Sequence, residues 1–172
     1  PRTRAILFNN PQNPTGRLFE SDELQIIADV AIAHDLTVIS DEVWEHVLLG
    51  GQSFGPLATL PGMAERTLKA GSAGKIFSLT GWKVGWIVAS PENAALAARA
   101  HQFLTFSTAP NLQAAVAFGL NEGDGWIDKM RGRFARALGR MSEGLKTAGY
   151  AVLEPGSTYF LCVHLRASGL GA

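Results

Sequence analysis

Three short polar segments hold the residue types that are best suited to chemistry: residues 10–16, 41–44 and 71–75. The third segment carries Lys75 between small residues, and an uncharged lysine amine is a nucleophile that attacks carbonyl groups. The second begins with the carboxylate of Asp41, and the first contains the amide of Asn13. These groups can act together only if folding brings the three segments to one place.

Lys75 has two other interpretations. A phosphate-binding loop of the nucleotide-hydrolase type needs a glycine five positions before Gly74 and a hydroxyl residue after the lysine, but Lys69 and Ile76 occupy those places. A lone lysine is most often a solvated surface residue. Ser72 and Lys83 supply a hydroxyl group and a second cation nearby, so they could form an anion cradle, although Lys83 could equally be a surface charge.

The other two segments also have plain structural interpretations. An acidic residue at the end of a strand, such as Asp41, often caps the turn that follows it. The sequence from Asn13 to Gly16 is a good turn in its own right, because proline fixes φ and glycine tolerates positive φ. Each of these two signals is therefore weak when it is taken alone.

The elements that would position these residues alternate between strands and helices. Apolar runs at Ala5–Phe8 and Leu36–Ser40 predict two buried strands, and a helix with Ser21 as its N-cap is expected between them. Two strands joined by a helix form a βαβ unit, which implies a parallel sheet. Ligands of open α/β sheets bind outside the carboxyl ends of the strands, so all three polar segments could line one pocket.

The rest of the chain continues this α/β pattern and then changes character near residue 123. Strands are expected at 67–70 and 86–89, and helices after Ser90 and after Pro110. Beyond residue 123 a long amphipathic helix, with a solvated basic stripe at Lys129, Arg133, Arg136 and Arg140, precedes two more strands at 150–153 and 159–164. We therefore expect one domain over 1–122, and a linker helix with the start of a second domain over 123–172.

Composition narrows the class of protein. The 172 residues are 47% hydrophobic and 17% charged, which is enough apolar material for a core. Fifteen basic residues balance fifteen acidic ones, and this argues against a nucleic-acid or anionic-membrane binder. A single cysteine, Cys162, fits a reducing compartment, so a cytoplasmic location is expected. The four histidines are scattered, and neither a metal site nor a membrane span is expected.

Taken together, the polar segments resemble a known family. The matching motifs are 10–16 (NPQNPTG), 40–43 (SDEV), 72–75 (SAGK) and 80–86 (TGWKVGW). In this order and at these separations they resemble the class I and II aminotransferases, which are pyridoxal-phosphate enzymes of fold type I. The resemblance runs from about residue 1 to about residue 165 and looks most like the kynurenine and methionine aminotransferase branch. It implies an α/β large domain with a mostly parallel sheet, followed by the start of a small α+β domain.

The resemblance also implies a role for each site residue. Lys75 would be the catalytic lysine that forms a Schiff base with pyridoxal phosphate and later moves a proton. Asp41 would hold the pyridine nitrogen protonated, and a protonated ring is an electron sink. Asn13 would contact the phenolic oxygen of the cofactor and the substrate carboxylate. Ser72 and Lys83 would hold the phosphate.

Two departures from the family pattern affect these expectations. Trp44 stands where the family usually has a tyrosine, whose hydroxyl forms a hydrogen bond with the phenolic oxygen of the cofactor. The indole N–H of a tryptophan can donate a hydrogen bond but cannot accept one. Trp44 is therefore either a neighbour of the cofactor or only a packing residue. The phosphate-binding turn and stacking aromatic that the family carries upstream, and its carboxylate-binding arginine downstream, have no counterpart, so the chain is expected to be a fragment that is inactive alone.

Three functions remain in view at this point. The first is an aminotransferase that acts on an amino acid and a 2-oxo acid, as a homodimer by resemblance. The second is a pyridoxal-phosphate-dependent carbon–sulfur β-lyase, because both reactions share the first carbanion. The third is a non-catalytic α/β module that binds a partner.

Overall fold

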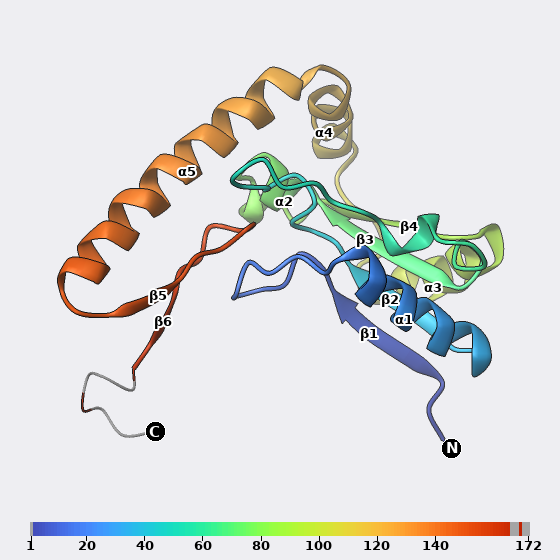
Figure 1. Ribbon diagram of the computed structural model, residues 1–172. Helices are drawn as coiled ribbons and strands as arrows, with labels where there is room; N and C mark the ends of the chain where they lie inside the picture. The colour runs from blue at the N-terminus through green and yellow to red at the C-terminus, as the bar shows by residue number, and fades with distance from the viewer. Residues whose placement is uncertain (1, 166–168, 170–172) are drawn as a thin grey trace.

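The main body of the molecule is a four-stranded sheet. The computed structural model describes residues 2–165 and 169, and it contains six strands in two sheets (Figure 1). The larger sheet has the order β1-β2-β3-β4, with β1 Ala5–Asn9, β2 Thr37–Asp41, β3 Thr67–Ser72 and β4 Gly85–Val88. The first three strands are parallel and β4 is antiparallel to β3. The predicted parallel βαβ unit is confirmed, and the chain has the expected α/β fold.

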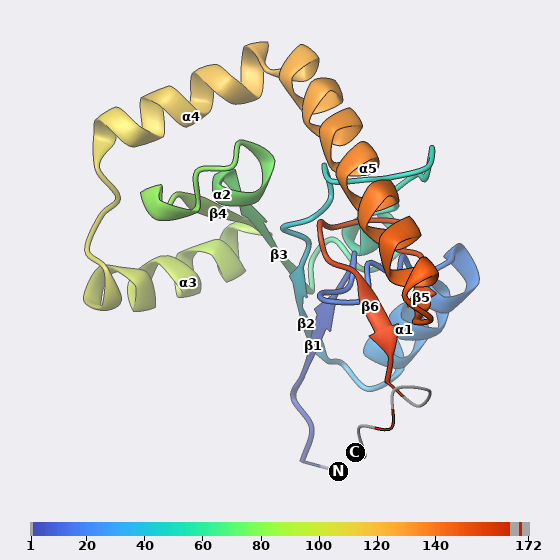
Figure 2. The ribbon, with the colours of Figure 1, turned by 90° about the vertical axis from the view of Figure 1, so that its left-hand side faces the viewer.

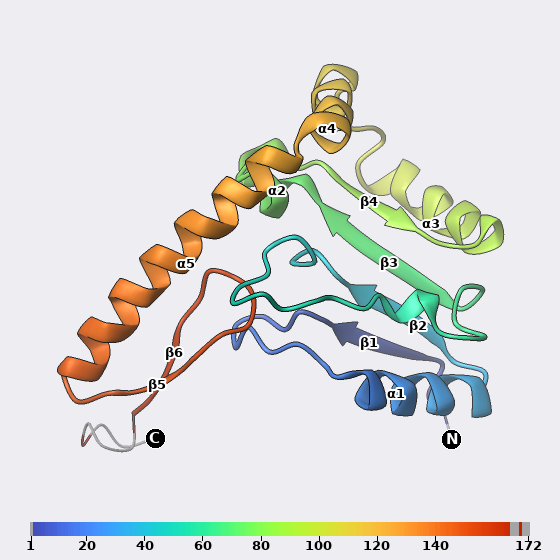
Figure 3. The ribbon, with the colours of Figure 1, turned by 45° about the horizontal axis from the view of Figure 1, so that its top comes forward.

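Helices lie on both sides of this sheet. The helices are α1 Ser21–Ala33, α2 Ala73–Ile76, α3 Pro91–Leu104, α4 Pro110–Glu122 and α5 Asp124–Thr147, with short 3-10 turns η1 Leu57–Thr59 and η2 Thr80–Trp82. Helices α1 and α3 lie on opposite sides of the sheet (Figure 2). Helix α5 runs diagonally from α4 to the smaller sheet (Figure 3). Within the described residues, none of these helices is both long and apolar enough to cross a bilayer.

Helix α1 forms because its ends and its apolar face agree. It begins one residue earlier than expected: the N-cap is Glu20, in an extended conformation, and its backbone N–H donates to Glu23 Oε2 at 2.9 Å. The expected cap at Ser21 is therefore wrong, because the reciprocal contact between Glu20 and Glu23 makes Ser21 the first helical residue. One apolar face of α1 is buried at Leu24, Ala28 and Ala31, and Leu24 packs with Phe8 and Val38 in the main core.

A second core joins the long helix α5 to the turn after β2 and to the loop between β5 and β6. The smaller sheet pairs β5 Ala151–Leu153 antiparallel to β6 Cys162–His164. Met130 of α5 is buried with Trp44 and Val47, and the partly buried ring of Phe134 packs against them. The second of the two predicted terminal strands, 159–164, is too long, because only Cys162–His164 pair with another strand. Tyr159 instead turns its ring onto Trp44, and positive φ at Thr158 redirects the chain just before it.

Candidate functional site

The three polar segments follow the carboxyl ends of the three parallel strands. Asn9 ends β1 and pairs in register with Asp41, the last residue of β2. The Asn9 side chain donates from Nδ2 to the backbone oxygen of Asp41 at 3.0 Å and accepts from the backbone N–H of Asn13 at 2.8 Å. Asn9 thus connects the loop of Asn13 to the end of β2 through its side chain. The side chain of Asn13 itself is exposed.

The carboxylate of Asp41 is half-buried and oriented by its own turn. Its Oδ1 accepts a hydrogen bond from the backbone N–H of Val43 at 3.3 Å, and within the described residues its other oxygen has no partner. The backbone N–H of Glu42 donates to the oxygen of Ala70 at 3.1 Å, so β2 stays beside β3 past its last paired residue. One carboxylate oxygen is therefore available to a donor at the edge of the sheet.

Lys75 lies just past the end of β3, in the short helix α2. Its half-buried side chain places Nζ 5.2 Å from the centre of the Trp44 ring, a distance at which an ammonium group is attracted to the face of an indole. The Trp44 side chain is only 1% exposed, and the edges of Tyr159 and Phe160 pack against it with ring centres 4.6 and 5.6 Å away. The structure thus brings together two predicted site residues, Lys75 and Trp44.

Strand pairing places Ser72 and Lys83 on adjoining segments. Ser72 pairs with Gly85, and the backbone N–H of Ala73 donates to the oxygen of Val84 at 3.1 Å, so Lys83 lies one step further along the same pairing. Lys83 is exposed, has a left-handed backbone with φ of 55°, and lines a hollow of about 390 Å³ together with residues of the α3–α4 loop. The hydroxyl and the second cation expected near Lys75 are therefore on adjoining segments.

Gly71 has a steric role in this arrangement. A Cβ atom at this position would lie 2.3 Å from Nε1 of Trp86, whose indole covers the backbone of Gly71 from the neighbouring strand. A side chain at position 71 would therefore have to displace the Trp86 indole. The glycine thus allows the ring of Trp86 to lie against β3.

Sequence inspection missed two groups near the site. The first is the pair Tyr159 and Phe160, which pack on Trp44 from the far end of the chain. The second is a charged cluster in which Lys69 on β3 forms ion pairs with Glu42 and Glu45. A signal for the second was present, because a lysine in the middle of an otherwise apolar buried strand needs an anionic partner.

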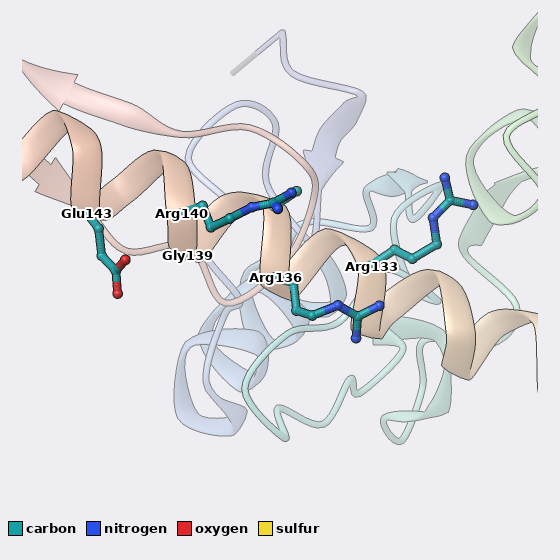
Figure 4. Close-up of a pocket in the computed structure, with 6 residues that line it drawn as sticks. Arg133, Arg136, Gly139, Arg140 and Glu143 are labelled. Atoms are coloured by element: carbon teal, nitrogen blue, oxygen red, sulfur yellow. The ribbon is translucent and has the colours of Figure 1, made fainter.

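A separate surface hollow lies along α5. It measures about 550 Å³ and is lined by Arg133, Arg136, Arg140 and Glu143 of that one helix. The three guanidinium groups extend in different directions and do not converge on one point (Figure 4). This geometry is that of the solvated basic face expected from the sequence. Within the described residues, no cluster of metal-binding side chains was found either.

Comparison with known proteins gives a consistent answer. The family described as aminotransferase class I and II matches residues 1–170. The solved structure of N-succinyldiaminopimelate aminotransferase from Mycobacterium tuberculosis superposes with a TM-score of 0.96 at 40% identity, over 99% of this chain and 44% of that one. A methionine aminotransferase from Escherichia coli superposes with a TM-score of 0.91 at 30% identity, over 98% and 44% of the two chains.

A sequence relative points the same way. The kynurenine–oxoglutarate transaminase of Dictyostelium discoideum is 40% identical over 93% of this chain and 38% of its own length. The chain therefore spans about two fifths of the length of the proteins that it matches.

Proposed function

Because the chain belongs to the family of class I and II aminotransferases, we propose that the gene product carrying it transfers an amino group between an amino acid and a 2-oxo acid. Pyridoxal phosphate is the cofactor of this family. The observation that carries the proposal is the placement of Lys75: a half-buried amine over the Trp44 ring, beyond the carboxyl edge of a parallel sheet that also presents Asp41.

The residues at this edge fit the cofactor in number and in chemistry. The cofactor would need an amine at one end of its pyridine ring and a carboxylate at the other. Asp41 ends β2, and Lys75 follows the end of β3, the neighbouring strand. Within the described residues these two side chains form no ion pair with each other. Asp41 keeps one carboxylate oxygen free for the ring nitrogen. Ser72 and Lys83 offer a hydroxyl and an ammonium group to the phosphate, the donor types that a dianion needs.

The proposed roles follow from these positions. When bound, the cofactor supplies an electron sink for the electron pair left on the amino acid when a proton leaves its Cα atom. Asp41 would hold the proton on the ring nitrogen, Lys75 would take the proton from Cα of the amino acid and deliver it to C4′ of the cofactor, and Asn13 would orient the phenolic oxygen and the substrate carboxylate. Trp44 would stand beside the cofactor ring in place of a hydroxyl donor, and its own buried indole faces the amine of Lys75.

Three further features belong to the proposal. The division into a large domain over 1–122 and a linker with a small domain over 123–172 is supported by Gly123, which separates α4 from α5, and by the separate β5–β6 sheet. A homodimer is supported by the exposed apolar side chains of Phe103 on α3, Phe106 in the α3–α4 loop and Phe118 on α4. The cytoplasmic location stays a prediction from the single free Cys162.

The test uses the purified gene product reconstituted with pyridoxal phosphate. We expect an absorption band of lysine-bound pyridoxal that Lys75→Ala removes and that Lys146→Ala, at an exposed ion pair on α5, leaves in place. A normal band in Lys75→Ala would contradict the assignment of Lys75. The reaction itself is tested by 2-oxo-acid-dependent amino transfer, and release of pyruvate and ammonia from cystathionine as the main reaction would show a β-lyase instead.

Asp41 gives a second, quantitative test. Opposite charges about 4 Å apart interact by roughly 4 kcal/mol at an effective dielectric constant near 20. Because about 1.4 kcal/mol changes a rate tenfold, we expect Asp41→Asn to lower kcat/KM by about 10³. Retention of more than about a tenth of the activity, with the cofactor still bound, would show that Asp41 does not hold the ring proton.

A further inference from the structure

A buried charged cluster lies directly behind the site on the α1 side of the sheet. Lys69 of β3 extends its Nζ to Glu45, with which it forms a close hydrogen-bonded ion pair, and to Oε2 of Glu42 at 3.6 Å. The three side chains are 17%, 12% and 1% exposed, so water screens their charges poorly. The proposed function uses none of them.

The buried carboxylate of Glu42 needs a cationic partner, and Lys69 supplies it. Oε1 of Glu42 accepts a hydrogen bond from the Ser40 hydroxyl at 2.8 Å, whereas Oε2 has no hydrogen-bond partner within the described residues. Burial raises the pKa of the Glu42 carboxyl, and the Ser40 hydroxyl, the Lys69 charge and the backbone N–H of Leu57 oppose that rise while Glu45 adds to it. Lys69 is therefore the cation that faces both carboxylates, and His46 Nε2 lies 3.8 Å from the outer one, Glu45 Oε1.

The two carboxylates flank Trp44 on one tight turn. Within this turn the backbone N–H of Glu45 donates to the oxygen of Glu42 at 3.0 Å, and that of Val47 donates to the oxygen of Trp44 at 2.8 Å. The ring of Trp44, in turn, faces Nζ of Lys75. Two lysines of the continuous β3–α2 segment thus hold one turn: Lys69 through the carboxylates on either side of Trp44, and Lys75 through the indole itself.

We propose that Lys69 is a positioning residue for the pyridoxal site: its ammonium group fixes the turn of residues 42–47, and through it the ring of Trp44, relative to Lys75 and Asp41. This inference rests on the proposed function for its effect on the cofactor. The expected effect on Trp44 does not depend on the proposed function, because it is a property of the protein without cofactor. A merely structural ion pair would stabilise the fold and leave the surroundings of Trp44 unchanged.

The test compares Lys69→Met with Lys146→Met. Lys146 lies on α5 and forms an exposed ion pair with Glu154, the residue after β5, and the second variant removes that pair. The difference in fluorescence between each gene product and its Trp44→Phe version isolates the emission of Trp44 from that of the other tryptophans. In the folded, cofactor-free protein we expect Lys69→Met to shift Trp44 emission to longer wavelength and Lys146→Met to leave it unchanged. With cofactor, misplacement of the turn by about 1 Å should lower kcat/KM by roughly 10- to 100-fold.

Glu45→Gln is the second variant, for the case that Lys69→Met does not fold. It weakens the same contact, keeps the Lys69–Glu42 pair, and should shift Trp44 emission in the same direction. The double variant Lys69→Met/Glu45→Gln should be no worse than Lys69→Met alone, because effects of paired groups do not add. The proposal is overturned if these variants unfold more easily but keep the Trp44 emission of the wild type. If the wild type binds no pyridoxal, the proposed function fails while the emission result still decides the role of Lys69.

Discussion

The two faces of the four-stranded sheet differ although the same strands make both. On the face under α1, Phe8 is 7% exposed and Val38 is fully buried. On the opposite face, their chain neighbours Leu7 and Ile39 are 79% and 43% exposed. Strands of a parallel sheet with apolar residues on both faces are normally covered on both sides. Only the α1 face is covered tightly by this chain.

The difference shows where the rigidity of the site originates. The face under α1 continues without a break from the apolar core to Ser40 and the Lys69 cluster behind Asp41. Helix α3 lies on the other side of the sheet (Figure 2), but none of its residues is buried. The described residues therefore cover this second face only loosely. Four predictions test this contrast, from the largest expected effect to the smallest.

The largest effect should come from placing a charge on the covered face. Val38→Asp buries an unpaired carboxylate against α1, and we expect a loss of more than about 4 kcal/mol of stability or no folded protein at all. Ile39→Asp, one residue along, should cost clearly less because its carboxylate reaches water. The measurement is urea unfolding of the 172-residue chain, in which the second face is loosely covered. Equal losses from the two variants would mean that the second face is as dry as the first.

Helix α1 allows the same contrast within one element. Leu24 points into the core and Ile26 is exposed, although both are apolar residues of one helical turn. We expect Leu24→Ala to cost about 2–4 kcal/mol by urea unfolding, because it removes buried methyl groups and leaves a cavity. Ile26→Ala should stay within about 0.5 kcal/mol. A comparable cost at Ile26 would show that α1 has a second packed side.

The charged end of the covered face should respond to pH. Burial raises the pKa of Glu42 above its unfolded value, so its contribution to stability is fully present below the unfolded pKa and is lost as the pH rises through the folded pKa. Glu42→Gln does not titrate and can still bond to Ser40. We therefore expect the unfolding midpoint of Glu42→Gln to rise relative to that of the wild type as the pH increases above 4.5, the ordinary pKa of a glutamate. A difference in unfolding midpoint between Glu42→Gln and the wild type that stays constant with pH would contradict the raised pKa of Glu42.

The smallest global effect should come from α3, on the loosely covered side. Ser90 caps this helix by accepting a hydrogen bond from the backbone N–H of Asn93 at 3.4 Å. Loss of such a cap costs about 1 kcal/mol of helix stability. Because α3 buries no residue, we expect Ser90→Ala to speed amide hydrogen exchange within α3 and to leave the global unfolding midpoint almost unchanged. A clear drop in that midpoint would show that α3 is part of the cooperative core.

Much of the fold was predictable because it depends on local patterns. The parallel βαβ unit follows from two apolar runs with an amphipathic helix between them, and the start of α3 follows from Ser90 before a proline. The N-cap of α1 was misplaced because Glu20 is not a usual capping residue, and its role depends on a reciprocal contact with Glu23. The shorter last strand reflects Tyr159, whose ring packs on Trp44 and takes it out of the sheet.

The sequence by itself determined which chemical groups follow the ends of strands: Asn13, Asp41 and Lys75, each after an apolar run in a fixed order. Only the tertiary structure decided which of them meet. The side chain of Asn9 is hydrogen-bonded to the backbone of both Asn13 and Asp41. The amine of Lys75 lies over the ring of Trp44, and Lys69 forms ion pairs with two carboxylates of a turn far away in the chain. These contacts depend on strand register and on packing between segments far apart in the chain, and spacing along a sequence encodes neither of them directly.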